Sequence, residues 1–136
     1  MVTAEEILAA LEAAFADRDF VPGLVPDPIA TFPAAHPAVG DLRVWLEGDE
    51  ATVEIGRLTH THVTAPATVT SPEERSAWVV RRLVEFLRCM FDDRVEISSS
   101  PDGMWTSIAE AEPEDLAPSE EGWRSFLWSG PVEAER

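Results

Sequence analysis

The sequence predicts an α+β fold, in which a single antiparallel or mixed sheet of about five strands packs against two helices in the order α-β-β-α-β-β-β. Three observations support this prediction. Two segments carry apolar residues at helical spacing behind capping signals, and several short segments alternate apolar and polar residues as half-buried strands do. Turn-forming residues separate these short segments. With 136 residues, of which 45% are hydrophobic, we expect residues 1–136 to form one domain.

Both helices are predicted from N-terminal capping signals. Thr3 and Glu6 have the spacing of a capping box and predict a helix over residues 4–17. Ser71 begins a Ser-Pro-Glu-Glu sequence, which combines an N-cap, a proline at the first helical position and a capping glutamate. It predicts the longest helix of the chain, over residues 72–92. The apolar face of this helix is expected to contain Trp78, Val79, Leu83, Phe86, Leu87, Met90 and Phe91.

A proline-rich segment, residues 20–40, follows the first helix. Its five prolines lack backbone donors, so we expect no regular interior strand or helix there. The same residues include several large apolar side chains: Phe20, Val21, Leu24, Val25, Ile29 and Phe32. We therefore expect an extended segment that packs along the body of the protein rather than a free linker.

Two strands are predicted between this segment and the second helix. Residues 42–46 alternate apolar and polar side chains, and a Gly-Asp-Glu turn follows them. The next strand is predicted over residues 51–63. Its apolar residues change from one face to the other near Gly56, which suggests a β-bulge or a sharp coil of the strand at that glycine.

Three more strands are predicted after the second helix. A short strand near residues 95–97 and a returning strand over residues 104–108 flank a Ser-Pro-Asp-Gly turn. Residues 109–122 are predicted to form an acidic loop. The last strand is expected over residues 123–128, where a Ser-Gly-Pro sequence stops it, and the tail over residues 132–136 is expected to be frayed.

The chain is strongly acidic, with 26 acidic residues against 10 basic ones and a net charge of −16. Nucleic acid and anionic membrane surfaces repel such a chain, so neither is an expected partner. A basic protein is an electrostatically favourable partner. No basic region precedes an apolar run at the start, and no apolar run approaches membrane-spanning length, so we expect a cytoplasmic protein. The single cysteine excludes an intrachain disulfide.

The acidic segment is the candidate partner-binding region. It contains Glu110, Glu112, Glu114, Asp115, Glu120 and Glu121, with no basic residue among them. Trp105 and Trp123 lie at or near its ends, and tryptophan is a frequent interface anchor. We expect these residues to lie near the contact with a basic protein. A solvated loop is the alternative interpretation of such a run of like charges.

A His-x-His pair, His60 and His62, is the alternative candidate site. Residues two apart on a strand point to the same side, so both imidazoles could bind one metal ion. A catalytic zinc site needs a third ligand and a structural site needs four; candidates are His36, Cys89 or a carboxylate. Two histidines at a half-exposed strand end are the other interpretation. Because only two ligands are visible, we expect no stoichiometric zinc and no cofactor.

The motifs of common nucleophile and phosphate-binding sites are absent from the sequence. It contains no G-x-S-x-G and no G-x-G-x-x-G, and the lack of lysine excludes a P-loop. Cys89 is expected to act as a small buried hydrophobic residue rather than as a nucleophile.

Two functional hypotheses follow. The first is a non-enzymatic protein-binding domain, inhibitory, immunity-like or chaperone-like toward a basic protein. In size and acidity the chain resembles toxin-neutralising immunity proteins and secretion chaperones, although the predicted C-terminal strand departs from the helix that secretion chaperones commonly carry there. The alternative is a small metal-dependent enzyme or metal-binding domain that uses His60 and His62.

Overall fold

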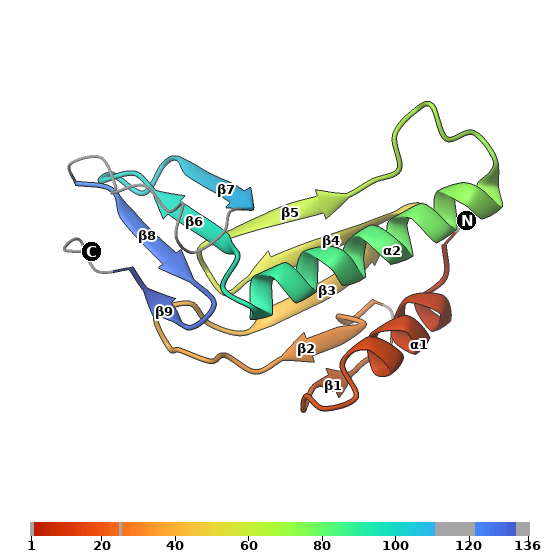
Figure 1. Ribbon diagram of the computed structural model, residues 1–136, viewed down its shortest axis with the longest axis horizontal. Helices are drawn as coiled ribbons and strands as arrows, with labels where there is room; N and C mark the ends of the chain where they lie inside the picture. Colours follow the sequence, from red (N-terminus) through yellow and green to blue (C-terminus); the bar gives the residue numbers. More distant parts are fainter. Residues whose placement is uncertain (1, 25, 111–121, 133–136) are drawn as a thin grey trace.

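The computed structural model describes residues 2–24, 26–110 and 122–132, within which two helices accompany two antiparallel sheets (Figure 1). The helices are α1 (Ala4–Ala14) and α2 (Pro72–Phe91). The five-stranded sheet has the order β1-β2-β3-β4-β5, and the four-stranded sheet has the order β7-β6-β8-β9. The strands span β1 (Val21–Pro22), β2 (Ala30–Phe32), β3 (Leu42–Glu47), β4 (Glu50–Ile55), β5 (Thr59–Val63), β6 (Val95–Ser99), β7 (Thr106–Glu110), β8 (Arg124–Leu127) and β9 (Gly130–Pro131). The predicted α+β class is confirmed.

Both helices begin at the predicted caps. The Thr3 hydroxyl accepts a hydrogen bond from the Glu6 N–H at 3.1 Å, and the Ser71 hydroxyl accepts one from the Glu74 N–H at 3.4 Å. α1 ends at Ala14 instead of residue 17, because Phe15 leaves the helical conformation. α2 lies across the five-stranded sheet with α1 beside it (Figure 1). Neither helix in the described part of the chain has the length and apolar character needed to cross a membrane.

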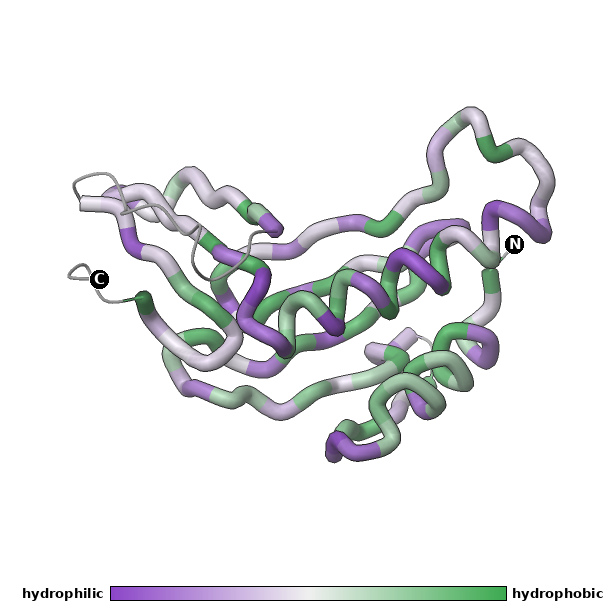
Figure 2. Tube along the Cα trace, in the orientation of Figure 1, coloured by the Kyte–Doolittle hydropathy of each residue, from purple (hydrophilic) through white to green (hydrophobic). Residues whose placement is uncertain are grey.

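A hydrophobic core joins the helices to both sheets. The predicted apolar face of α2 is buried except at Trp78, which is half-buried. Phe86, Leu87 and Met90 have exposed fractions of 5%, 0% and 0%. They pack in one cluster with Val44 of the five-stranded sheet and Ile97 of the four-stranded sheet. Figure 2 shows the corresponding alternation of hydrophobic and hydrophilic residues along α2. The amphipathic pattern of this helix therefore organises the packing of both sheets.

An aromatic cluster connects elements that are distant in the sequence. The ring centroid of Phe91, the last residue of α2, lies 5.3 Å from that of Phe15, 5.0 Å from that of Phe32 and 5.2 Å from that of Trp128. These partners follow α1, belong to β2 and follow β8, respectively. Edge-to-face and tilted contacts of this kind add to the stabilisation that burial of the rings supplies.

The segment 51–63 is two strands and not one bulged strand. β4 ends at Ile55, and the Leu58 N–H donates to the Ile55 carbonyl at 3.0 Å to close a turn. Gly56 has a φ of +51°, a conformation that glycine adopts at little cost. The change of apolar face near Gly56 thus marks a reversal of the chain, after which β5 pairs with β4.

The proline-rich segment is extended and packed, as expected, but it contributes two short strands. β2 contains no proline, and its residues Ala30 and Phe32 pair with Val44 and Leu42 of β3. Pro22 lies in β1, at the edge of the sheet, where a missing N–H costs least. The prediction of no regular interior strand in residues 20–40 is wrong for β2, because the prolines flank this strand rather than interrupt it.

The C-terminal region also differs from the prediction. The last strand begins at Arg124 instead of residue 123, and the Ser-Gly-Pro sequence reverses the chain instead of stopping it, since β9 pairs with β8. The Val132 N–H donates to the Ser125 carbonyl at 2.8 Å, so the start of the predicted frayed tail is attached to the sheet. The first two residues of the predicted acidic loop belong to β7, and residues 111–121 and 133–136 lie outside the described residues. The strands after α2 form a separate sheet, which corrects the expectation of a single one.

Candidate functional site

The two long edge strands of the sheets lie beside each other. β5 is the edge of the five-stranded sheet and β7 is the edge of the four-stranded sheet. Near the start of both strands, the hydroxyl oxygens of Thr59 and Thr106 are 3.1 Å apart. Farther along, a groove of about 380 Å³ separates the strands. The two sheets therefore meet through side chains at one end and leave an opening at the other.

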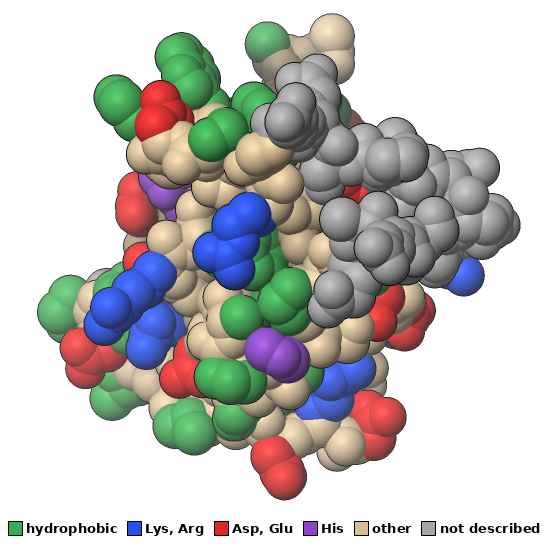
Figure 3. All heavy atoms as spheres, turned by 90° about the vertical axis from the view of Figure 1, so that its left-hand side faces the viewer, with side chains coloured by type: hydrophobic (Ala, Val, Ile, Leu, Met, Phe, Trp, Pro, Cys, Tyr) green, Lys and Arg blue, Asp and Glu red, His purple; other side chains and the backbone are tan. Residues whose placement is uncertain are grey.

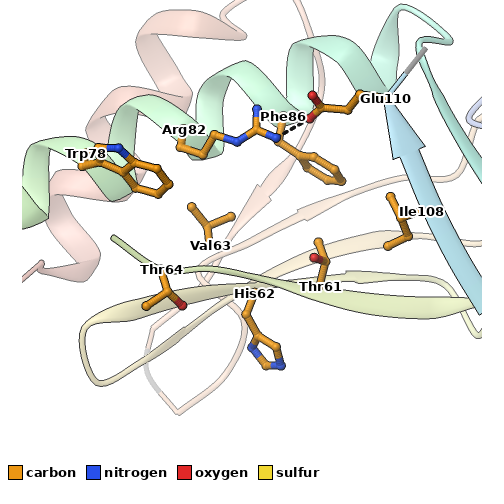
Figure 4. Close-up of a pocket in the computed structure, with 9 residues that line it drawn as sticks. All are labelled: Thr61, His62, Val63, Thr64, Trp78, Arg82, Phe86, Ile108 and Glu110. Carbon is orange, nitrogen blue, oxygen red and sulfur yellow. Dashed lines mark hydrogen bonds and ion pairs between the residues drawn. The ribbon is translucent and has the colours of Figure 1, made fainter. Parts of the chain in front are cut away.

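Three elements line this groove, as Figure 4 shows. Residues 61–64 form one wall, and Ile108 and Glu110 of β7 form the opposite wall. Trp78, Arg82 and Phe86 project from α2 between the walls. The helical residues are spaced four apart, so they follow one stripe of α2. Apolar side chains from two elements thus face the backbone of an edge strand.

An ion pair crosses the groove between α2 and β7. The Arg82 guanidinium donates a hydrogen bond to the Glu110 carboxylate, and it also lies 4.0 Å from the Glu85 carboxylate. The positive charge of Arg82 is therefore compensated inside the groove. Because all these side chains are partly exposed, the pairs fix positions more than they add stability.

The structure places some of the predicted partner-binding residues. Glu110 ends β7 at the groove. Trp105 is 71% exposed in the turn between β6 and β7, and Trp123 is half-buried just before β8. Trp105 and Trp123 directly precede Thr106 and Arg124, which both pair with Ser99 at the end of β6. The two tryptophans therefore lie at the same end of the four-stranded sheet. Glu110 lies at the other end, where it pairs with Val95. Glu112, Glu114, Asp115, Glu120 and Glu121 lie outside the described residues.

The end of the molecule formed by the four-stranded sheet has a mixed surface. Figure 3 shows hydrophobic side chains exposed there between basic and acidic ones. The largest exposed hydrophobic side chains at this end are Met104 and Trp105, at 78% and 71%. Both belong to the turn that joins β6 to β7, next to the start of the groove strand β7.

Hydrogen bonds to Asp102 hold this turn. Its carboxylate accepts from the Ser100 hydroxyl at 2.6 Å and from the Met104 N–H at 3.0 Å. The Ser100 hydroxyl in turn accepts from the Trp105 N–H at 3.0 Å. The Ser100 bond, followed by the Met104 bond, holds the pKa of the Asp102 carboxyl below its ordinary value.

The hydrogen bonds to the Asp102 carboxylate predict that acid destabilises the turn between β6 and β7. Because the pKa of Asp102 is lowered in the folded state, its ionised carboxylate stabilises the turn fully above the ordinary aspartate pKa, about 3.9. This stabilisation is lost as the pH falls through the lowered pKa. An NMR titration of the Asp102 carboxyl should give a value below the ordinary one. Ser100→Ala should raise it, and Ser107→Ala, in the adjacent strand, should leave it unchanged. An unshifted Asp102 in the unmodified chain contradicts the prediction.

His60 and His62 lie on the outer face of the five-stranded sheet, away from the helices. The ring of His62 points away from the α2 stripe in Figure 4, although its backbone lines the groove. The ring centroids of the two histidines are 5.2 Å apart. The donor atoms of His62, Glu47 and Glu50 all lie within 4.8 Å of one another. Sequence reasoning missed both glutamates.

The other suggested ligands do not join this group. His36 accepts a hydrogen bond from the Ala38 N–H through Nδ1 at 3.0 Å, and its ring lies against Gly130. Cys89 is partly buried within α2 and packs against the core. Burial, followed by the charge of Glu110, raises the pKa of the Cys89 thiol. A thiol with a raised pKa is a poor nucleophile.

The lining of the groove is partly polar and partly apolar. It combines threonines, apolar side chains and one compensated ion pair, together with an open strand edge. Comparison of the chain with protein-family models, curated proteins and solved structures finds no match.

Proposed function

We propose that this protein is a non-enzymatic protein-binding domain that holds an extended segment of a basic protein against β5, in the groove between β5 and β7. The observation that carries the proposal is the pair of long edge strands that flank one partly apolar groove. An extended peptide binds such an edge by adding a strand, with backbone hydrogen bonds for affinity and side-chain pockets for specificity.

The four sheet edges differ in a way that favours this site. β1 and β9 contain two residues each and include Pro22 and Pro131, so they offer little backbone for pairing. β5 and β7 contain five residues each and no proline. Long unprotected edges attract strands from other chains, and folded proteins usually protect them. Here both such edges face the same groove, which supports a role in binding.

The side chains of the groove suit an extended segment. Successive side chains of a strand point to opposite faces. One set would therefore contact Trp78 and Phe86 of α2 and Ile108 of β7, while the other set would point to the outer face of the five-stranded sheet.

Charge supports a basic partner. The chain carries −16, and Arg82, the arginine in the groove lining, is paired with Glu110. A field of this sign speeds the encounter with a basic protein and slows it with an acidic one. The acidic residues Glu112, Glu114 and Asp115 follow β7 directly in the sequence and add to this field.

Site-specific photo-crosslinking in the producing cells tests the proposal. A photoreactive residue in place of Thr61 should capture a basic protein, whereas the same residue in place of Val21, on the opposite edge strand β1, should not. Trp78→Ala should lower the yield of the Thr61 adduct, and Arg81→Ala, an exposed change on the same helix, should not. Equal capture at Thr61 and Val21, or capture of only acidic proteins or nucleic acid, contradicts the proposal.

Association kinetics with the captured protein test the electrostatic part separately. Association should slow as salt is added, since exposed charges are screened over about 10 Å at 0.1 M ionic strength. Replacing Glu112, Glu114 and Asp115 with neutral residues should slow association and reduce its salt dependence, with little effect on folding. An association rate that ignores both changes contradicts a steering role for these acids.

A further inference from the structure

Two glutamates face each other on the outer face of the five-stranded sheet. Glu47 ends β3 and Glu50 begins β4, and the register pairs them directly across the turn that joins these strands. Like charges directly opposite in an antiparallel pair destabilise a sheet. Among the described residues no arginine pairs with either carboxylate, because Arg43, on the same strand as Glu47, is engaged with Asp41 and Glu54. A cation from solution would relieve this repulsion.

An imidazole lies next to the two carboxylates. His62 of β5 pairs with Thr52, and its Nδ1 lies 3.0 Å from the Thr52 hydroxyl and 3.4 Å from the Glu50 Oε1. The Thr64 hydroxyl donates to the other oxygen of Glu50 at 2.6 Å. This second contact orients the Glu50 carboxylate so that its free oxygen faces the imidazole, as outer hydrogen bonds do in metal sites.

We propose that Glu47, Glu50 and His62 form a binding site for a divalent transition-metal ion such as Zn²⁺. Their donor atoms lie within 4.8 Å of one another, and ligand bonds of about 2.0–2.2 Å need only small side-chain rotations from that arrangement. One imidazole and two carboxylates are ordinary zinc ligands and leave a position open for water or for a group of another molecule. The site is separate from the groove interior, so it does not depend on the proposed function.

The proposal changes the role of the His-x-His pair. His62 is a ligand, whereas His60 packs edge-on against its ring at 5.2 Å and acts as a positioning residue. The earlier expectation of no stoichiometric zinc rested on two visible ligands. The fold adds two carboxylates to one of these imidazoles, and three protein ligands are enough for an open zinc site.

Calorimetric titration of the untagged, chelator-treated chain with zinc chloride tests the site. We expect one zinc ion per chain. His62→Ala and Glu50→Gln should each weaken binding by at least about 10-fold, and His60→Ala should weaken it less. Glu54→Gln is the matched control: it removes the same charge from the same strand and face, outside the group of three, and should leave the affinity nearly unchanged.

Three results overturn the proposal. One is the absence of saturable binding in the folded chain. Another is an equal loss in Glu54→Gln and Glu50→Gln, which would show that general acidity attracts the ion. The third is unchanged binding in His62→Ala. Circular dichroism of each variant separates loss of the site from loss of the fold, and Co²⁺ absorption provides an independent reading of ligand geometry. Neither measurement involves a protein partner, so failure here leaves the proposed function untouched.

Discussion

Replacing Gly56 with alanine should lower the free energy of unfolding by more than about 3 kcal/mol. A Cβ at this position would lie 1.7 Å from the Val39 carbonyl oxygen and 3.0 Å from the Cα of Gly40. Both neighbours are backbone atoms of the segment between β2 and β3, so neither can move without shifting that segment. The φ of +51° adds strain for any residue with a side chain. Because this turn aligns β5 with β4, the change should disturb the groove and the metal ligands together.

Gly48→Ala is the matched control for this prediction. Gly48 also has a positive φ, +61°, but a Cβ there would have open space around it. Its replacement should lower the free energy of unfolding by about 1 kcal/mol, because only the unfavourable positive φ contributes. Urea denaturation followed by tryptophan fluorescence measures both variants. Similar losses for Gly48→Ala and Gly56→Ala would show that the close approach at Gly56 is not a feature of the folded protein.

Leu87→Ala should destabilise the protein by about 2–5 kcal/mol. The Leu87 side chain is fully buried on the face of α2 that packs into the core shared by the two sheets. Its truncation removes apolar contacts and leaves a cavity, since the surrounding strands cannot collapse fully around it.

Arg81→Ala is the control for the core prediction, since Arg81 is exposed on the same helix. It should change stability by no more than about 0.5 kcal/mol. Thermal and urea unfolding of both variants measure the difference. If Leu87→Ala lowers the free energy of unfolding as little as Arg81→Ala does, the packing of α2 against the sheets is contradicted.

The parts of the fold that depend on local chemistry were predictable. The caps at Thr3 and Ser71 specify where the helices start, and the apolar stripe of α2 specifies its buried face. The prediction of one strand across Gly56 is wrong, because a bulge and a hairpin produce the same change of apolar face in the sequence. The Gly-Arg-Leu sequence there also lacks the usual two-residue hairpin signals.

The arrangement of the strands depends on distant contacts that local patterns do not specify. A single sheet would need backbone pairing between the strands before and after α2. Instead, in the part of the chain that the structure describes, β5 and β7 share no backbone pairing, and a side-chain contact joins the hydroxyls of Thr59 and Thr106. The groove results from this division into two sheets, so no sequence motif predicts it.

One of the three proposed metal ligands, His62, was visible in the sequence. The His-x-His spacing correctly brings His60 and His62 to one face. The predicted Gly-Asp-Glu turn includes Glu50, whereas in the structure Glu50 begins β4 and pairs with Glu47 of β3. The sequence did not predict the hairpin at Gly56, and it is this hairpin that brings His62 back beside Glu50.

Amide hydrogen exchange of the chain, alone and bound to the protein captured at Thr61, shows whether the partner adds a strand to β5. Backbone groups on an open edge exchange readily, and those paired with an added strand are protected. We expect slower exchange over residues 59–64 in the complex, with the exchange of β1 unchanged. Protection confined to the turn around Trp105, with the exchange of β5 unaltered, would contradict it.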